Sequence, residues 1–327
     1  MKLHLIIGVF LLVGFAAANA GDKTTARLDA AVGALRPGEP MMVWVFFTDK
    51  GVGNLPRAPI PRELVTQRSL DRRSNVRPPD RLVDETDLPL DPSYVDAVAR
   101  LVLAVRHPSK WFNGVSVLAS PRQIPALRLL PFVCAIDLVD RQGRPGDRER
   151  LEQPMIAPPA PLGRVAGANA LNYGPSLAQV SLENIPAVHD SGNSAQGIII
   201  GVFDNGFRML AHQAFDSLRT RIIGTYDFVD HKVSVAPNDP TAGYHGINTL
   251  STLAGYFPGQ LIGPAYGASF ILARTENDSS ETPVEEDNWV RAIEWAYSLG
   301  VQVASTSLGY FTYDAPYTSW TWENMDG

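Results

Sequence analysis

The chain has 327 residues, of which 45% are hydrophobic and 19% charged, so its composition excludes a largely disordered protein and its length excludes a single small module. Its 28 basic and 34 acidic residues give a net charge of -6 without a strongly basic stretch, which argues against nucleic acid as a partner. The one cysteine, Cys134, excludes an intramolecular disulfide and a zinc site made of several thiolates.

The first residues have the pattern of an export signal. A short basic start precedes an almost unbroken apolar run over residues 5–18, and Ala18-Asn19-Ala20 offers small residues for cleavage. This run is shorter than the roughly 20 apolar residues that cross a bilayer, which favours a cleaved signal peptide over a membrane anchor. We therefore expect residues 1–20 to be removed and the protein to be secreted, extracellular or periplasmic, without a membrane partner.

Residues 21–140 predict a small α+β domain whose core spans about residues 40–140. Apolar runs and alternation predict strands at residues 41–47, 111–118 and 132–138, and helical spacing predicts helices at residues 94–105 and 121–130. Strands and helices alternate along the chain, which suits a sandwich with both helices on one face of a sheet.

Polar segments border these elements. Residues 51–61 carry several turn residues and predict a loop. Residues 67–81 are rich in arginine and predict a solvated basic helix and turn, with a dibasic processing site at Arg72-Arg73 as the alternative. Residues 141–175 combine charge with clustered prolines, so we expect a solvated interdomain linker that a protease can reach.

From about residue 176 the pattern changes to strands that alternate with helices. Residues 198–203, 269–273 and 301–305 are short apolar runs, typical of parallel strands covered on both faces. A helix is predicted before the last of them, from a capping box at residues 282–285 to Gly300. We therefore expect residues 176–327 to form an α/β domain.

Two residues at the predicted element boundaries are candidates for chemistry. Asp204 directly follows a predicted strand, and functional groups of a parallel sheet collect at the carboxyl ends of its strands. An ordinary aspartate turn is the alternative. His245 begins a predicted helix whose start can face a cleft, and a structural histidine is the alternative. The sequence contains neither a dinucleotide-binding glycine motif nor a zinc-binding histidine spacing.

Four ordered segments resemble the subtilisin-like serine peptidases, or subtilases. They are residues 201–206 (GVFDNG), 245–255 (HGINTLSTLAG), 263–268 (GPAYGA, with proline and alanine displaced) and 292–309 (AIEWAYSLGVQVASTSLG). The resemblance implies an α/β fold in which a parallel sheet with flanking helices, incomplete in this sequence, follows a small α+β propeptide. In this family the propeptide templates folding and inhibits the enzyme until it is cut away.

The resemblance also implies roles for individual residues. Asp204 would orient His245, which would act as general base toward a serine, while Ser307, Leu308 and Gly309 would bind an extended substrate strand. The implied partners are protein or peptide substrates and the intramolecular propeptide. Subtilases often bind calcium, but no ligand set is identified, and Asp227 and Asp230 are as readily surface groups.

The sequence departs from the family in three places. No residue after His245 lies in a Gly-Thr-Ser-x-Ala motif, and Ser319 is a poor nucleophile candidate, so we expect the N-terminal part of a longer enzyme, itself inactive. Asn205 and Ile247 replace hydroxyl residues of the family, so two expected hydrogen bonds cannot form in the usual way. The alternative function is a non-catalytic binding or protease-inhibitory protein derived from a subtilase.

An acidic cluster precedes the last predicted helix. We expect a solvated loop with carboxylates favoured at a helix N-terminus, and the alternative is a preference for basic substrates. The cluster comprises Glu276, Asp278, Glu281, Glu285, Glu286 and Asp287.

Overall fold

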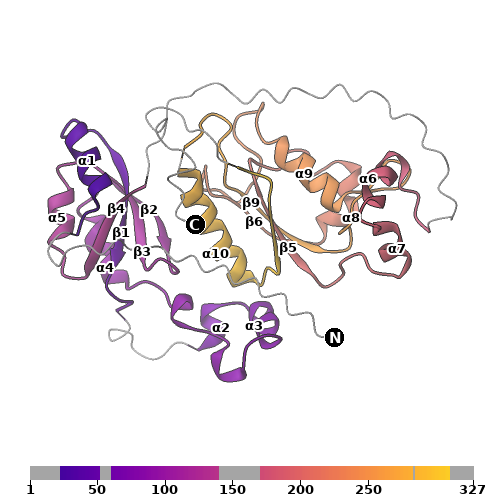
Figure 1. Ribbon diagram of the computed structural model, residues 1–327, viewed down its shortest axis with the longest axis horizontal. Helices are drawn as coiled ribbons and strands as arrows, with labels where there is room; N and C mark the ends of the chain where they lie inside the picture. The colour runs from indigo at the N-terminus through magenta and orange to yellow at the C-terminus, as the bar shows by residue number, and fades with distance from the viewer. Residues whose placement is uncertain (1–22, 52–59, 140–169, 283, 310–327) are drawn as a thin grey trace.

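The computed structural model describes residues 23–51, 60–139, 170–282 and 284–309. Two four-stranded sheets organise these residues, an antiparallel one in the N-terminal part and a parallel one in the C-terminal part. Helix α10 (Val284–Leu299) lies between the two sheets (Figure 1). The expected signal peptide, most of the predicted loop at 51–61, most of the linker and Ser319 lie outside the described residues.

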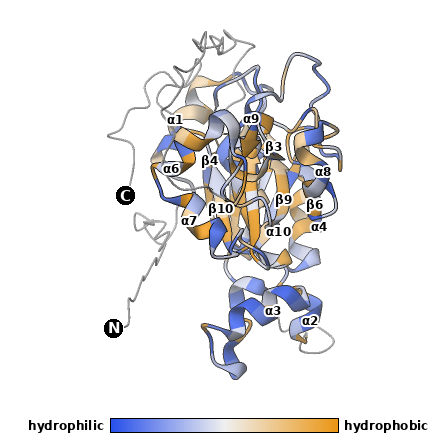
Figure 2. Cartoon of the chain, turned by 90° about the vertical axis from the view of Figure 1, so that its right-hand side faces the viewer, coloured by the Kyte–Doolittle hydropathy of each residue, from blue (hydrophilic) through white to orange (hydrophobic). Residues whose placement is uncertain are grey.

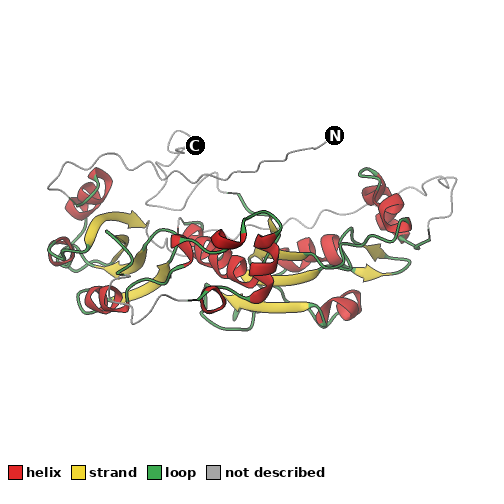
Figure 3. Cartoon of the chain, turned by 90° about the horizontal axis from the view of Figure 1, so that it is seen from below, coloured by secondary structure: helices red, strands yellow, loops and turns green. Residues whose placement is uncertain are grey.

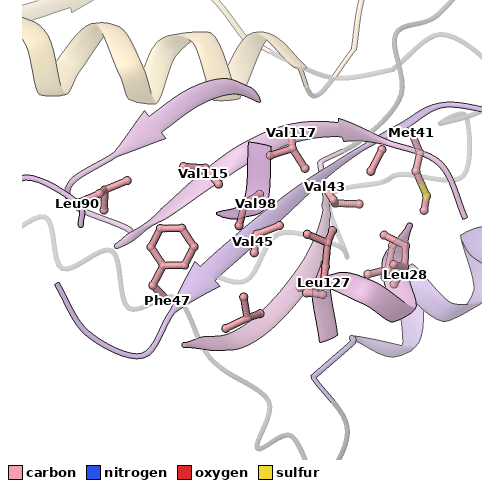
Figure 4. Packing of buried hydrophobic residues seen from close by; sticks show 14 residues of the cluster. Leu28, Met41, Val43, Val45, Phe47, Leu90, Val98, Val115, Val117 and Leu127 are labelled. Atoms are coloured by element: carbon pink, nitrogen blue, oxygen red, sulfur yellow. The ribbon is translucent and has the colours of Figure 1, made fainter. Parts of the chain in front are cut away.

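The N-terminal sheet has the strand order β2-β3-β1-β4. Its strands are β1 (Met41–Phe47), β2 (Ala104–Ser109), β3 (Gly114–Ala119) and β4 (Val133–Val139). On one face they pack against Leu28 of α1 (Ala26–Ala34), Val98 of α4 (Pro92–Ala99) and Leu127 of α5 (Ile124–Arg128), as Figure 4 shows. Both predicted helices therefore lie on the same face of the sheet, as expected.

Strand β2 was not predicted, and part of it was assigned to the helix at residues 94–105. The helix ends at Ala99, and the chain then turns into a strand that contains Arg106, His107 and Pro108. Proline removes a ladder hydrogen bond, and it is tolerated here because β2 is the edge strand of the sheet. Strand β2 lacks the apolar alternation that predicts a strand, because its polar residues contact α10 rather than an apolar core.

The arginine-rich segment at residues 67–81 begins with α3 (Gln67–Ser74), and the short helix α2 (Pro61–Leu64) precedes it; both appear mostly hydrophilic in Figure 2. The expected solvated helix is wrong for Arg73, whose side chain is 1% exposed. Its guanidinium makes two hydrogen bonds of 2.6 and 2.8 Å to the equally buried Asp87 and lies over the ring of Tyr297. This burial argues against processing at Arg72-Arg73.

The C-terminal sheet has the order β10-β5-β9-β6 and is parallel throughout. Its strands are β5 (Ile199–Asp204), β6 (Ile222–Asp227), β9 (Ser269–Arg274) and β10 (Val303–Thr306), and β6 was not predicted. Alternate strand residues pack against α9 (His245–Ala254) on one side and α10 on the other. This arrangement confirms an α/β domain with helices on both faces of a parallel sheet.

Shorter elements complete the C-terminal part. They are α6 (Leu177–Ser181), α7 (Ile185–Asp190), α8 (Asp216–Arg219) and the two-stranded sheet of β7 (Tyr256–Phe257) and β8 (Leu261–Ile262). Figure 3 shows strands toward both ends of the molecule, with helices between and around them. No helix in the described ranges has the length and apolar character needed to cross a membrane.

The second face of the N-terminal sheet docks on α10. Its apolar part joins Met42 and Val139 to Val284, at the start of the helix. The rest is polar and buried, since Ser116 Oγ donates to Asp287 at 2.8 Å and Glu294 accepts hydrogen bonds from the turn between β2 and β3. One helix therefore belongs to the cores of both parts of the chain.

Candidate active site

Asp204 and His245, 41 positions apart in the sequence, meet at the carboxyl end of β5. Asp204 is the last residue of β5 and is fully buried, while His245 is the first residue of α9. His245 Nδ1 lies 2.7 Å from Asp204 Oδ1, which also accepts the N–H of Asn205 at 2.7 Å. The predicted pairing of these two side chains is present in the structure.

The close approach of α9 to β5 requires Gly246. A Cβ atom at this position would lie 2.3 Å from the carbonyl oxygen of Gly206 and 2.9 Å from Asp204 Cβ, so any larger residue would push the helix away. The backbone N–H of Gly246 instead donates to Asn205 Oδ1 at 3.0 Å. The glycine after His245 thus sets the distance between the imidazole and the carboxylate.

The exposure of the two groups differs in a way that suits proton transfer. Asp204 has no exposed surface, whereas the His245 side chain is 33% exposed. An ionised carboxylate only accepts hydrogen bonds, so this contact assigns the proton of the neutral imidazole to Nδ1 and the lone pair to Nε2. The ring is therefore held from behind, with part of its surface open to a reactant.

Thr249, which sequence reasoning missed, contacts the other oxygen of the carboxylate. Its Oγ1 lies 3.1 Å from Asp204 Oδ2. The available signal was its spacing, because residues four apart on a helix share a face and Thr249 follows His245 by four positions. Ile247, by contrast, is buried in the apolar core with Leu250. The hydroxyl expected two residues after the histidine is thus supplied four residues after it.

Asn205 fits the site through contacts different from those of a hydroxyl. Its Nδ2 donates at 2.7 Å to Asp278, which in turn accepts the N–H of Gly243 at 2.9 Å. The side chain thereby connects the strand end to the loop before α9 and to the acidic segment. The amide of Asn205 therefore donates to the carboxylate of Asp278 and not to that of the neighbouring Asp204.

A buried ion cluster lies at the same edge of the sheet. Arg274, at the end of β9, donates to Asp227 at 3.0 Å and to Asp230 at 2.8 Å, and its Nε donates to the carbonyl of Asn205. Asp227 has no exposed surface, so the expectation of a surface group is wrong for it. Arg274 and Lys232, whose Nζ lies 3.4 Å from Asp230, together balance the charge of the two aspartates, and Arg274 also supports the loop behind Asp204.

Half of the acidic cluster is buried, contrary to the solvated loop expected from the sequence. Glu276, Glu285 and Asp287 are between 1% and 7% exposed, and Glu286 is exposed. Burial, reinforced by the charge of Glu276, raises the pKa of Glu285 well above its usual range, and burial raises the pKa of Asp287 to about 6. These carboxyls lie inside the protein because they contact the N-terminal sheet and the loop at Asn277.

The segment Ser307-Leu308-Gly309 directly follows β10, whose last residue Thr306 is in register with Phe203 of β5. It therefore lies at the same edge of the sheet as Asp204. Ser307 and Gly309 are exposed and Leu308 is half-buried. In the part of the chain that the structure describes, no group of three or more His, Cys, Asp or Glu residues is arranged to hold a metal ion. No calcium ligands are assigned.

Comparison with known proteins identifies the N-terminal part. Residues 42–153 match the family model of the peptidase S8 propeptide domain of Bacteroidota. No curated protein matches the chain.

Similar solved structures include fervidolysin from Fervidobacterium pennivorans, a keratinolytic enzyme related to subtilisin (TM-score 0.46, 16% identity, 83% of this chain and 36% of that one). They also include the epidermin leader peptide processing serine protease of Staphylococcus aureus (TM-score 0.46, 14% identity, 83% and 50%) and its S393A mutant (0.42, 14%, 82% and 50%). The chain spans half or less of each of these structures. The match to residues 42–153 therefore shows a peptidase S8 propeptide domain in the N-terminal part of the chain.

Proposed function

We propose that this chain is part of a secreted serine endopeptidase precursor that hydrolyses peptide bonds in proteins through an Asp/His/Ser triad. The observation that carries the proposal is the 2.7 Å hydrogen bond between a fully buried Asp204 and a partly exposed His245. A buried carboxylate behind an accessible imidazole is the arrangement that a general base needs, because it orients the ring and stabilises the imidazolium that forms.

In the proposed mechanism, His245 Nε2 takes the proton from a serine hydroxyl as that oxygen attacks the substrate carbonyl, and later delivers it to the leaving amine. Asp204 stays ionised and keeps the Nδ1–H tautomer throughout. We propose that the serine is encoded beyond Gly327, which leaves residues 21–327 inactive on their own.

Ser307, Leu308 and Gly309 are the proposed contacts for the substrate backbone. Their position at the end of the edge strand β10, with Ser307 and Gly309 exposed, suits an extended peptide, which would gain main-chain hydrogen bonds with little demand on its side chains. A preference for basic substrates receives little support, because three of the six carboxylates of the acidic cluster are buried.

We propose that residues 21–140 form the propeptide, that residues 1–20 direct export, and that cleavage within residues 141–175 releases residues 176–327. The docking of the N-terminal sheet on α10 supports this role, because it ties a propeptide-like domain to a helix of the peptidase core. A docked propeptide would support the folding of α10 and would keep the enzyme inactive until it is cut away.

The test compares peptidase activity of residues 21–327 with that of a protein extended through the downstream reading frame, each with a His245→Ala control. Activity confined to the extended protein and lost in its control is the expected result. Hydrolysis by the shorter protein that depends on His245 would disprove the proposed position of the serine. Inactivity of both proteins would favour the binding or inhibitory alternative.

A further inference from the structure

The two oxygens of the Asp204 carboxylate have different partners. Oδ1 accepts from His245 Nδ1 and from the backbone of Asn205, both at 2.7 Å. Oδ2 is contacted by Thr249 Oγ1 at 3.1 Å, and Thr249 is the one donor to this oxygen among the residues that the structure describes. Since Asp204 has no exposed surface, bulk water does not solvate Oδ2 in place of the threonine.

The Thr249 hydroxyl has one proton and two acceptors within reach. Asp204 Oδ2 lies at 3.1 Å and the carbonyl oxygen of Gly246, three residues back on the helix, at 3.0 Å. A hydrogen bond to an ionised acceptor is about twice as strong as one to a neutral acceptor. The proton therefore goes to the carboxylate, and the carbonyl contact only fixes the rotamer that aims the hydroxyl at it.

We propose that Thr249 is a positioning residue for the dyad, acting through Asp204. Donors on both oxygens fix the rotation of the carboxylate group, which keeps Oδ1 directed at His245 Nδ1. They also share the negative charge of Asp204 between two acceptor atoms. The inference rests on the proposed peptidase function only for its effect on catalysis, because the effect on the imidazole is a property of the folded chain.

A matched control lies on the same helix. Thr252 Oγ1 donates to the carbonyl of Thr249 at 2.8 Å, which is the same three-residue contact that Thr249 makes with Gly246, and Thr252 is exposed. Thr252→Val therefore removes a threonine hydroxyl from the same helix, as Thr249→Val does, but leaves the contacts of Asp204 unchanged. Thr249→Ser removes only the methyl group and keeps the donor.

The test is an NMR titration of the His245 ring in the full chain, with its signals assigned by comparison with His245→Ala. In Thr249→Val the carboxylate loses a donor, so its charge acts more strongly on the ring, and the pKa of His245 rises by about 0.5 to 1 unit. Thr249→Ser and Thr252→Val leave this pKa within about 0.2 of the unsubstituted value. In the extended protein, Thr249→Val lowers kcat about tenfold with little change in KM.

An unshifted His245 pKa in folded Thr249→Val, or an equal shift in Thr252→Val, overturns the proposal. If the valine variant does not fold, Thr249→Ala replaces it in the same titration, with the same expected rise. Failure of the peptidase proposal is distinguishable, because an extended protein without hydrolytic activity leaves the NMR comparison intact. A shifted pKa together with unchanged kcat would also contradict a positioning role.

Discussion

One buried carboxylate, Glu294, makes several of the hydrogen bonds that dock the N-terminal sheet on α10. The side chain is 2% exposed and accepts hydrogen bonds from Ser109 Oγ, from the N–H of Lys110 at 2.9 Å and from the N–H of Trp111 at 3.2 Å. These three donors lie at the end of β2 and in the turn that leads to β3, so the carboxylate caps that turn across the interface. Glu294→Gln keeps the size of the side chain and removes its charge.

The cost of this change follows from the donors. Two of the three hydrogen bonds keep an oxygen acceptor but lose its charge, which weakens each by about 1 kcal/mol. The new NH2 group faces an N–H donor, so the third hydrogen bond is not made, at a cost of about 1 kcal/mol or more. The total is about 3 kcal/mol. Every 1.4 kcal/mol corresponds to a factor of about ten in an equilibrium constant, so local opening of the interface becomes roughly 100-fold more frequent.

Amide hydrogen exchange measures this opening directly at Lys110 and Trp111. We expect both amides of Glu294→Gln to exchange roughly 100-fold faster than in the unsubstituted chain, under conditions where exchange reports the opening equilibrium. Glu286→Gln is the control, because Glu286 lies on the exposed side of the same helix. A rise of less than about threefold, or an equal rise in the control, would refute the reasoning that this carboxylate stabilises the interface.

Three further predictions concern single side chains. Asp204→Asn allows the wrong imidazole tautomer of His245 and should lower kcat of the extended protein by about 10⁴-fold; a loss below about tenfold in a peptidase assay would exclude the proposed dyad. Burial lowers the pKa of His107 from 6.5 to about 3, so the unfolded chain binds a proton at this histidine before the folded chain does. The free energy of unfolding therefore decreases as the pH falls from 6.5 toward 3. His107→Gln should therefore reduce the acid sensitivity of unfolding between pH 7 and pH 4 by about 3 kcal/mol in urea titrations, and equal sensitivity in both proteins would contradict this. Asp87→Asn leaves the charge of Arg73 buried without its carboxylate and should destabilise the chain by about 3 to 5 kcal/mol, and a change below about 1 kcal/mol in thermal unfolding would count against it.

Much of the architecture was predictable because local patterns and tertiary structure agree. The run at residues 41–47 forms β1 with the predicted bounds, since its alternate side chains face two apolar surfaces. The strand before Asp204 and the helix that begins at His245 were also placed correctly. The two strands were predictable because of their strong β-propensity, and the helix because of its helical periodicity.

The errors share a physical cause. Strand β2, the burial of Arg73 and the burial of Glu285 all involve polar residues that point into the protein. Sequence patterns assign such residues to the surface, because the cost of burying a polar or charged group is offset only by a partner that the local pattern does not identify. Asp87 is the partner of Arg73, and α10 is the partner of β2.

The sequence alone determined the α/β class of the C-terminal part, the α+β class of the N-terminal part, and Asp204 and His245 as candidates, because these depend on periodicity and on motifs within short segments. Only the tertiary structure decided which groups complete the site. Thr249 reaches Asp204 across 45 positions, and Asp278 reaches Asn205 across 73. Such contacts depend on how strand β5, helix α9 and the loop after β9 meet in space, and no local pattern records that geometry.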